Sequence, residues 1–204
     1  MIGILLILQA TCTYPAEPAQ VTRDMRRAIA VVCRQKIAAN PRDIEAYRTL
    51  GYALLDSPRE GLEVLQSALR VAPDDYFFQL NAGLCLRQLN RLKEALAALK
   101  RAATLDSARA EDALVQAGLV AHQMGRYGEA EVLFRDALRR APESRYVGRT
   151  WGYLARSLYR QDRYRQAVDA WDRADSLSPH GFIDEAGDRS LYQRSQALSS
   201  KQRP

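Results

Sequence analysis

The sequence predicts an all-α fold made of repeated helix pairs, and three observations support this prediction. Apolar residues are 47% of the chain and consist mostly of Leu and Ala, while aromatic residues are only 8%. This mixture favours helices over a sheet. The 8 prolines and 11 glycines are too few for long linkers. Finally, one order of small and large residues recurs four times along the chain at intervals of 34, 35 and 37 residues.

The recurring order marks the second helix of each pair. A small residue opens it, a large apolar residue follows and a second small residue comes next. The opening small residues are Gly61, Ala95, Ala130 and Ala167. The large residues are Leu65, Leu99, Phe134 and Trp171, and the second small residues are Ala68, Ala102, Ala137 and Ala174. A further small residue lies upstream in each pair, at Gly51, Gly83, Gly118 and Ala155. Small residues let paired helices approach closely, and the large residue fills the space between neighbouring pairs.

The ends of the repeats divide the chain. Five residues after each second small residue comes Pro73, Ser107, Pro142 or Pro179, and proline ends a helix. The repeats therefore cover about 41–73, 74–107, 108–142 and 143–179. Residues 21–40 precede Pro41 and are predicted to form a capping helix or half repeat. Residues 180–204 are predicted to form a C-terminal capping helix with a frayed tail, in which Ile183, Gly187, Leu191 and Leu198 share one face.

This pattern resembles the tetratricopeptide repeat (TPR), a 34-residue helix-turn-helix unit. Trp151 to Ala155 carries its opening W-x2-L-small motif, and Tyr47 to Gly51 carries it with Tyr for Trp. Met124 to Ala130 and Gln161 to Ala167 resemble the family's inter-helix turn. The first repeat departs by a turn two residues short, and the second by Ser107 in place of proline. The resemblance implies a right-handed α-solenoid of four TPR units with capping helices at both ends, because no unit buries its apolar face alone.

The same resemblance implies a concave groove lined by the first helix of each unit. The predicted peptide-binding positions are Arg48, Tyr52, Leu80, Asn81, Leu84, Val115, Gln116, Leu119, His122, Arg149, Tyr153, Arg156, Tyr159 and Arg160. The middle of this set is apolar, and its C-terminal end is basic and aromatic. It predicts a ligand with an apolar segment followed by acidic groups, bound as an extended strand or helix. The alternative is that Leu80, Leu84 and Leu119 pack against the second helices or against a terminal helix.

One TPR subclass holds the C-terminal carboxylate of chaperone tails with a basic and amide clamp. By the resemblance, those positions hold Arg48, Tyr52, Asn81, Asp112 and Gln116. Asp112 repels a carboxylate, and only Arg48 and Asn81 suit the clamp. The sequence therefore argues against chaperone-tail binding of that type.

The charge is concentrated in one part of the chain. The formal net charge is +6, from 30 Lys and Arg against 24 Asp and Glu. Residues 139–173 hold nine Arg against Glu143, Asp162, Asp169 and Asp172, a net +5. This Arg-rich third supports an alternative function, the binding of an anionic surface such as nucleic acid or lipid headgroups. The alternative is a solvated helix surface, which the lack of a base-stacking motif favours, and nucleic acid is not the expected partner.

The sequence gives no sign of an enzyme or of a cofactor. It contains no G-x-S-x-G, H-E-x-x-H or P-loop motif. Two His and three scattered Cys are too few for a zinc module. His122 lacks an evident acidic partner, so a polar groove contact is predicted for it. Cys33 and Cys85 lie in apolar helical patterns and are predicted to be buried.

The N-terminus differs from the rest. Residues 1–12 are largely apolar and uncharged, and the Pro/Ala-rich residues 13–20 are typical of a tether. The segment has the outline of an export signal, and Cys12 after small residues resembles a bacterial lipoprotein signal. A frayed apolar N-terminus is the alternative.

We therefore expect a non-enzymatic protein-interaction scaffold that binds a partner peptide or helix in its groove. If the export signal is present, we expect the protein in the periplasm or at a membrane through a lipid anchor. There it is expected to help assemble a bacterial envelope complex. Without that signal the protein is cytoplasmic.

Overall fold

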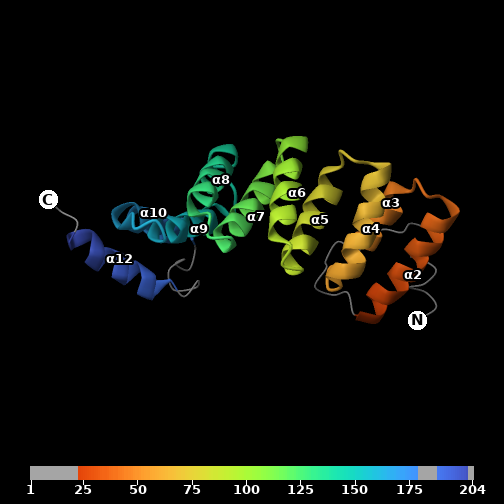
Figure 1. Ribbon diagram of the computed structural model, residues 1–204, viewed down its shortest axis with the longest axis horizontal. Coiled ribbons are helices and arrows are strands. Elements are labelled where there is room, and N and C mark those ends of the chain that lie inside the picture. Colours follow the sequence, from red (N-terminus) through yellow and green to blue (C-terminus); the bar gives the residue numbers. More distant parts are fainter. Residues whose placement is uncertain (1–22, 179–187, 202–204) are drawn as a thin grey trace. The chain divides into compact units, whose positions relative to one another are not determined.

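The computed structural model describes residues 23–178 and 188–201, which form ten helices and contain no strand (Figure 1). The all-α prediction is confirmed. In chain order the helices are α2 (Arg23–Ala39), α3 (Ile44–Ala53), α4 (Pro58–Val71), α5 (Tyr76–Gln88), α6 (Leu92–Leu105), α7 (Ala110–Gln123), α8 (Tyr127–Arg140), α9 (Val147–Tyr159), α10 (Tyr164–Ser176) and α12 (Arg189–Lys201). The predicted signal and tether, with Cys12, lie outside the described residues, as do His180, Ile183 and Gly187.

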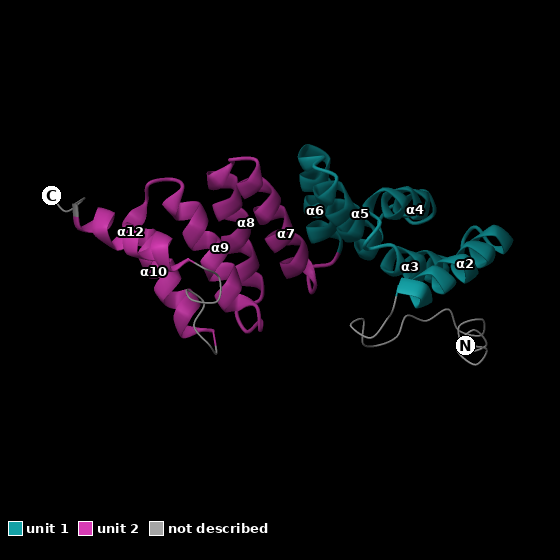
Figure 2. Ribbon diagram, turned by 90° about the horizontal axis from the view of Figure 1, so that it is seen from below, with its two compact units in different colours: residues 1–105 teal, residues 106–204 magenta. Residues whose placement is uncertain are grey.

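The helices form two compact units, residues 1–105 and 106–204, coloured separately in Figure 2. In the first unit α2 packs on α3, α3 on α4, α4 on α5 and α5 on α6. In the second, α7 packs on α8, α8 on α9, α9 on α10 and α10 on α12. Each unit therefore consists of helix pairs that bury their apolar faces against their neighbours.

The small and large residues of the repeat meet inside each pair. Phe134 on α8 is fully buried, and a Cβ added to Gly118 on α7 would lie 2.5 Å from its ring. A Cβ at Gly83 on α5 would lie 2.6 Å from Leu99 on α6. Such distances are shorter than van der Waals contact, so only glycine fits at these two crossings. This close approach is what the repeated order of residue sizes predicts.

The turns inside the last three helix pairs share one backbone geometry. Asn90, Gly125 and Asp162 all adopt positive φ, of 59°, 74° and 59°. The following N–H in each case donates back to a carbonyl of the first helix: Arg91 to Leu86 at 2.9 Å, Arg126 to Ala121 at 2.9 Å and Arg163 to Leu158 at 3.1 Å. Gly, Asn and Asp tolerate this left-handed conformation best. The shorter turn before α4 closes instead through Ser57 N–H and the Leu54 carbonyl, at 2.8 Å.

The helix α12 covers the last repeat through polar contacts that the sequence does not reveal. Asp188, only 3% exposed, accepts hydrogen bonds from Arg156 Nε at 2.9 Å and from Trp171 Nε1 at 3.1 Å. Tyr192 donates to Asp172 at 2.7 Å, and this bond raises the pKa of Tyr192 to about 12. The carboxylates of Asp188 and Asp172 therefore join α12 to α9 and α10.

Cys33 and Cys85 are both buried, as predicted. Burial raises the pKa of the Cys85 thiol, which disfavours the reactive thiolate.

Candidate functional site

The predicted groove positions fall in both compact units. Those from Arg48 to Leu84 lie on α3 and α5 of the first unit, and those from Val115 to Arg160 lie on α7 and α9, or at the end of α9, in the second. We describe each set within its own unit.

In the first unit, most of the predicted positions already have partners. Arg48 donates to Asp75 at 2.6 Å and to Glu45 at 3.0 Å, and the bond to Asp75 raises the pKa of its guanidinium. Tyr52, 40% exposed, packs its ring on Phe77 with centroids 4.7 Å apart. Asn81 is buried and donates to the Phe77 carbonyl at 2.8 Å. Leu80 and Leu84 are half-buried. This face offers few side chains that are ready for a ligand.

In the second unit, five predicted positions come together around one cavity. A hollow of about 210 Å³ lies between α7 and α9, and we call it the α7–α9 groove. The predicted residues that line it are Val115, Gln116, Leu119, Arg149 and Tyr153. Sequence reasoning missed Tyr146 and Thr150, which complete the lining. The sequence does contain a signal for both residues. Positions 146, 149, 150 and 153 have the spacing of one helix face, and 149 and 153 were predicted to line the groove.

The groove combines apolar walls with a polar edge. Val115 and Leu119 are half-buried on α7, and Tyr153 packs against the buried Phe134 ring with centroids 5.8 Å apart. Thr150 is 2% exposed, and its hydroxyl donates to the Tyr146 carbonyl at 3.2 Å. The Thr150 hydroxyl is therefore satisfied within the protein.

Two arginines flank Tyr146 at the polar edge. The Arg145 guanidinium lies 4.6 Å from the centroid of the Tyr146 ring and donates to its hydroxyl. The Arg149 guanidinium lies 5.9 Å from the same centroid. Both side chains are exposed, and neither forms an ion pair with any residue in the ranges that the structure describes. Within those ranges, this edge therefore carries positive charge that no carboxylate pairs with.

Two other predicted groove residues make contacts within the second unit. Arg156 is held by the buried Asp188, and its guanidinium lies 5.6 Å from the centroid of the Tyr153 ring. Tyr159 packs against Trp171 and Tyr164, with centroids 6.2 Å and 5.6 Å apart. The sequence could not reveal the contact of Arg156, because its partner Asp188 lies outside the repeats.

The last two predicted positions meet at the C-terminal ends of α7 and α9. The ring of His122 lies 5.1 Å from that of Tyr127, and Arg160 donates to the Tyr127 hydroxyl at 2.8 Å. Burial lowers the pKa of His122, and the charges of Arg160 and Arg156 lower it further. His122 is therefore neutral at pH 7.

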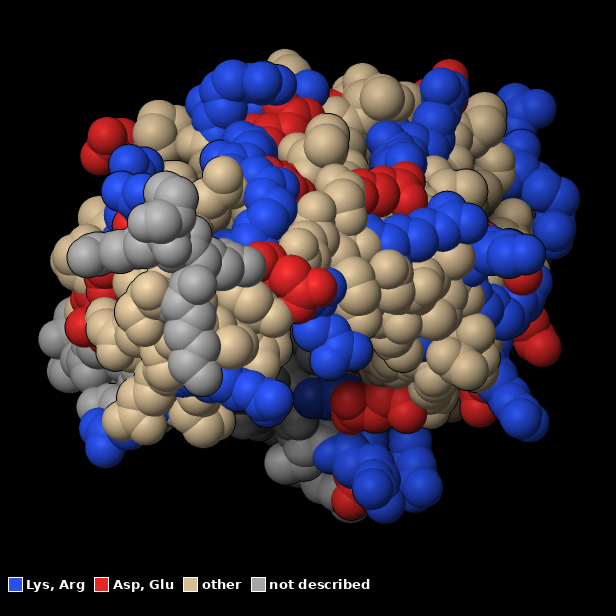
Figure 3. Space-filling view, turned by 60° about the vertical axis from the view of Figure 1, so that its left-hand side comes forward, with Lys and Arg blue, Asp and Glu red and all other residues tan. Residues whose placement is uncertain are grey.

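Several arginines of the Arg-rich third, residues 139–173, form ion pairs with acidic residues. Arg139 and Arg140 bind Asp136, Arg156 binds Asp188, and Arg163 binds Glu131. Four of its nine arginines thus form ion pairs, with three carboxylates between them. On the face in Figure 3, blue basic side chains alternate with red acidic ones over tan surface.

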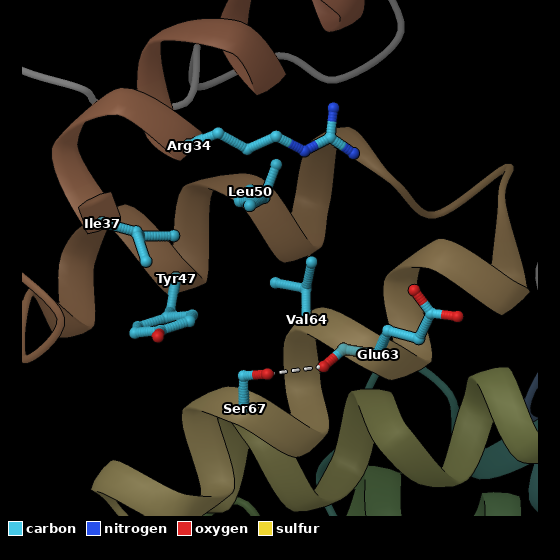
Figure 4. Close-up of a pocket in the computed structure, with 7 residues that line it drawn as sticks. All are labelled: Arg34, Ile37, Tyr47, Leu50, Glu63, Val64 and Ser67. Carbon is cyan, nitrogen blue, oxygen red and sulfur yellow. Dashed lines mark hydrogen bonds between the residues drawn. The ribbon is translucent and has the colours of Figure 1, made fainter.

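A second cavity, of about 230 Å³, lies in the first unit between α2, α3 and α4 (Figure 4). Its lining is Arg34, Ile37, Tyr47, Leu50, Glu63, Val64 and Ser67. Arg34 pairs with Glu60 at 2.8 Å, and the Ser67 hydroxyl donates to the Glu63 carbonyl at 3.0 Å. Two of its polar side chains, Arg34 and Ser67, thus have partners within the protein, and the sequence analysis does not predict this cavity.

Within the described ranges, no group of three or more His, Cys, Asp or Glu side chains is placed to hold a metal ion. In the same ranges, no helix has the length and apolar content needed to cross a bilayer.

Comparisons with known proteins agree with this architecture. Two family models described as tetratricopeptide repeat match residues 55–111 and 111–144. No curated protein sequence matches the chain. Among solved structures, one titled "Crystal structure of MamA" superposes with a TM-score of 0.71 at 18% identity, over 81% of this chain and 96% of that one.

Two further solved structures have the same fold. YrrB, titled "a TPR protein with an unusual peptide-binding site", gives a TM-score of 0.69 at 17% identity over 81% of this chain and 84% of its own. A structure titled for pilF of Pseudomonas aeruginosa gives 0.68 at 18% identity over 95% and 89%. At these identities the likeness shows the fold alone, and it confirms the predicted α-solenoid of TPR units.

Proposed function

We propose, from the premise that this chain belongs to the tetratricopeptide-repeat family, that it is a non-enzymatic scaffold for protein interaction. It holds an extended segment of a partner protein in the α7–α9 groove. Repeat proteins of this kind bind through such surfaces because each repeat adds side chains to one continuous face.

One observation carries the proposal. The α7–α9 groove is a hollow of about 210 Å³ lined by both apolar and polar side chains, and its edge carries two exposed arginines and the 38% exposed ring of Tyr146. Peptide sites have this composition, in which apolar and aromatic walls provide affinity and a few polar groups fix orientation. The related fold of YrrB, whose title names a peptide-binding site, supports peptide binding as a use of this architecture.

The test compares two matched variants. Leu119→Glu places a charge in the wall of the groove, while Val132→Glu makes a similar change at a 67% exposed position on α8 of the same unit. Peptides are selected from a random twelve-residue display library on the native chain, and binding to each variant is measured. We expect Leu119→Glu to weaken binding about tenfold or more and Val132→Glu to leave it unchanged. A library that yields no binder, or equal binding by both variants, contradicts the proposal.

The location in a bacterial envelope remains part of this proposal, and residues 1–20 support it by their apolar and then Pro/Ala-rich composition. The mass of the N-terminal peptide of the protein isolated from cells tests it. Removal of the apolar segment, or a lipid on Cys12, supports the envelope role. An intact Met1 contradicts it.

A further inference from the structure

We infer that the partner segment carries an acidic side chain beside an apolar one: the acid pairs with Arg149 and the apolar side chain enters the hollow of the α7–α9 groove. This inference rests on the proposed function and specifies the ligand's chemistry. It combines two properties of the groove, the size of its hollow and the charge at its edge.

The hollow fits one apolar side chain. Its volume of about 210 Å³ matches the scale of a single large residue, and its walls include Val115, Leu119 and the Tyr153 ring. Filling it removes apolar surface from water on both partners, which favours binding. The Thr150 hydroxyl already donates to the Tyr146 carbonyl, so it does not require a polar group on the ligand inside the hollow.

The edge fits a carboxylate. Arg149 is exposed and has no ion-pair partner among the described residues. The second arginine, Arg145, lies against the same Tyr146 ring and adds a second positive charge. The guanidinium group binds carboxylates through two parallel hydrogen bonds, which fixes both position and direction.

The charges in and around the groove favour an acidic ligand over a basic one. Its seven lining residues include Arg149 and no acid. The acids closest in sequence are Asp112, one turn before Gln116 on α7, and Glu143 in the loop before α9, and neither forms an ion pair with Arg149. Like charges opposed in a binding site exclude wrong partners, so Arg149 also discriminates against basic segments.

The experiment uses the full chain and the same random twelve-residue library. Selection is run in parallel on the native chain, on Arg149→Glu and on Arg165→Glu. Arg165 is an exposed residue of α10 that lines none of the described cavities, so its substitution makes the same change in net charge away from the groove. Circular dichroism confirms that each variant is folded.

On the native chain and on Arg165→Glu we expect peptides enriched in Asp or Glu next to a large apolar residue. On Arg149→Glu, we expect binding of those peptides to fall about tenfold or more, and basic residues to replace the acids in newly selected peptides.

The outcomes separate the two proposals. Peptides that need Leu119 but show no acidic preference, or that bind Arg149→Glu as well as the native chain, overturn this inference and leave the peptide groove standing. A library that yields no binder overturns both. An acidic preference that Arg165→Glu abolishes equally reflects net charge, and it also overturns the assignment to Arg149.

Discussion

At the scale of single residues, the paired helices can pack closely because glycine has no side chain at the points where they cross. The missing Cβ of Gly118 leaves the space that Phe134 fills. We predict that Gly118→Ala destabilises the protein by about 1–3 kcal/mol, because the buried ring has to shift. Urea unfolding measures this.

The matched control for that variant is Gly128→Ala. Gly128 lies in the first turn of α8, where the nearest atom to an added Cβ is Gln161 Oε1 at 3.9 Å. Alanine fits there and has the higher helix propensity, so we expect stability unchanged or raised by up to about 1 kcal/mol. Equal losses for both variants would show that backbone effects, and not the Phe134 ring, explain the result.

Glu131 is a second residue whose surroundings decide its behaviour. It stands on α8 at the repeat position that holds Leu62 and Leu96 in earlier repeats, and it is 9% exposed. Burial acts to raise its pKa, but hydrogen bonds from Arg135, Gln161 and Arg163 outweigh it, and the net pKa is lowered from 4.5. The folded state therefore binds this proton less tightly than the unfolded state does.

That difference sets the direction of a pH effect. The stabilisation from Glu131 is present above its unfolded pKa of 4.5 and is lost as the pH falls through its lower folded pKa. We predict that the difference in unfolding free energy between the native chain and Glu131→Gln shrinks as the pH falls from 7 to 3. Urea unfolding at several pH values measures it, and a difference that stays constant over this range would contradict the assigned bonds.

At the scale of elements, α12 is attached to the last repeat by two carboxylates. Asp188→Asn removes the negative charge of the carboxylate to which Arg156 and Trp171 both donate hydrogen bonds. We predict a loss of about 1–3 kcal/mol, since Arg156 is partly solvated and loses only part of the pair's energy. We also predict faster hydrogen exchange in residues 189–201.

The pKa of the Tyr192 phenol gives an independent measure of whether α12 is docked on the last repeat. While α12 is docked, its pKa is about 12 through Asp172, and in a detached helix it returns toward 10. The raised pKa stabilises the docked helix below pH 10, and this stabilisation disappears as the pH rises toward 12. Ultraviolet titration of Asp188→Asn follows it, with Asp169→Asn, an exposed change on α10, as the control. An unchanged Tyr192 titration in Asp188→Asn means that Asp188 does not hold α12.

The helices of the repeats could be predicted from sequence, and the polar contacts of the cap could not. Gly118 and Phe134 recur at fixed positions because packing demands one size of side chain at each. Asp188 belongs to no repeat, so nothing in the periodic pattern pairs it with Arg156. The repeat pattern thus predicts which helix faces carry the candidate groove residues, but it could not predict that Arg156 pairs with Asp188.

At the scale of the whole molecule, the net charge of +6 allows weak attraction to polyanions. Because four of the nine arginines in the Arg-rich third form ion pairs, we predict weak binding of duplex DNA or anionic vesicles at about 50 mM salt, and none at about 200 mM. Gel shift and vesicle sedimentation over this range measure it. Tight binding that survives the higher salt would favour the anionic-surface function instead.

The central claim is that the α7–α9 groove receives a segment of the partner protein. Hydrogen exchange of the full chain, with and without a selected peptide, tests it most directly. The account predicts slower exchange in Ala110–Gln123 and Val147–Tyr159 and no change in Arg23–Ala39 of the first unit. Slower exchange confined to other helices would contradict it.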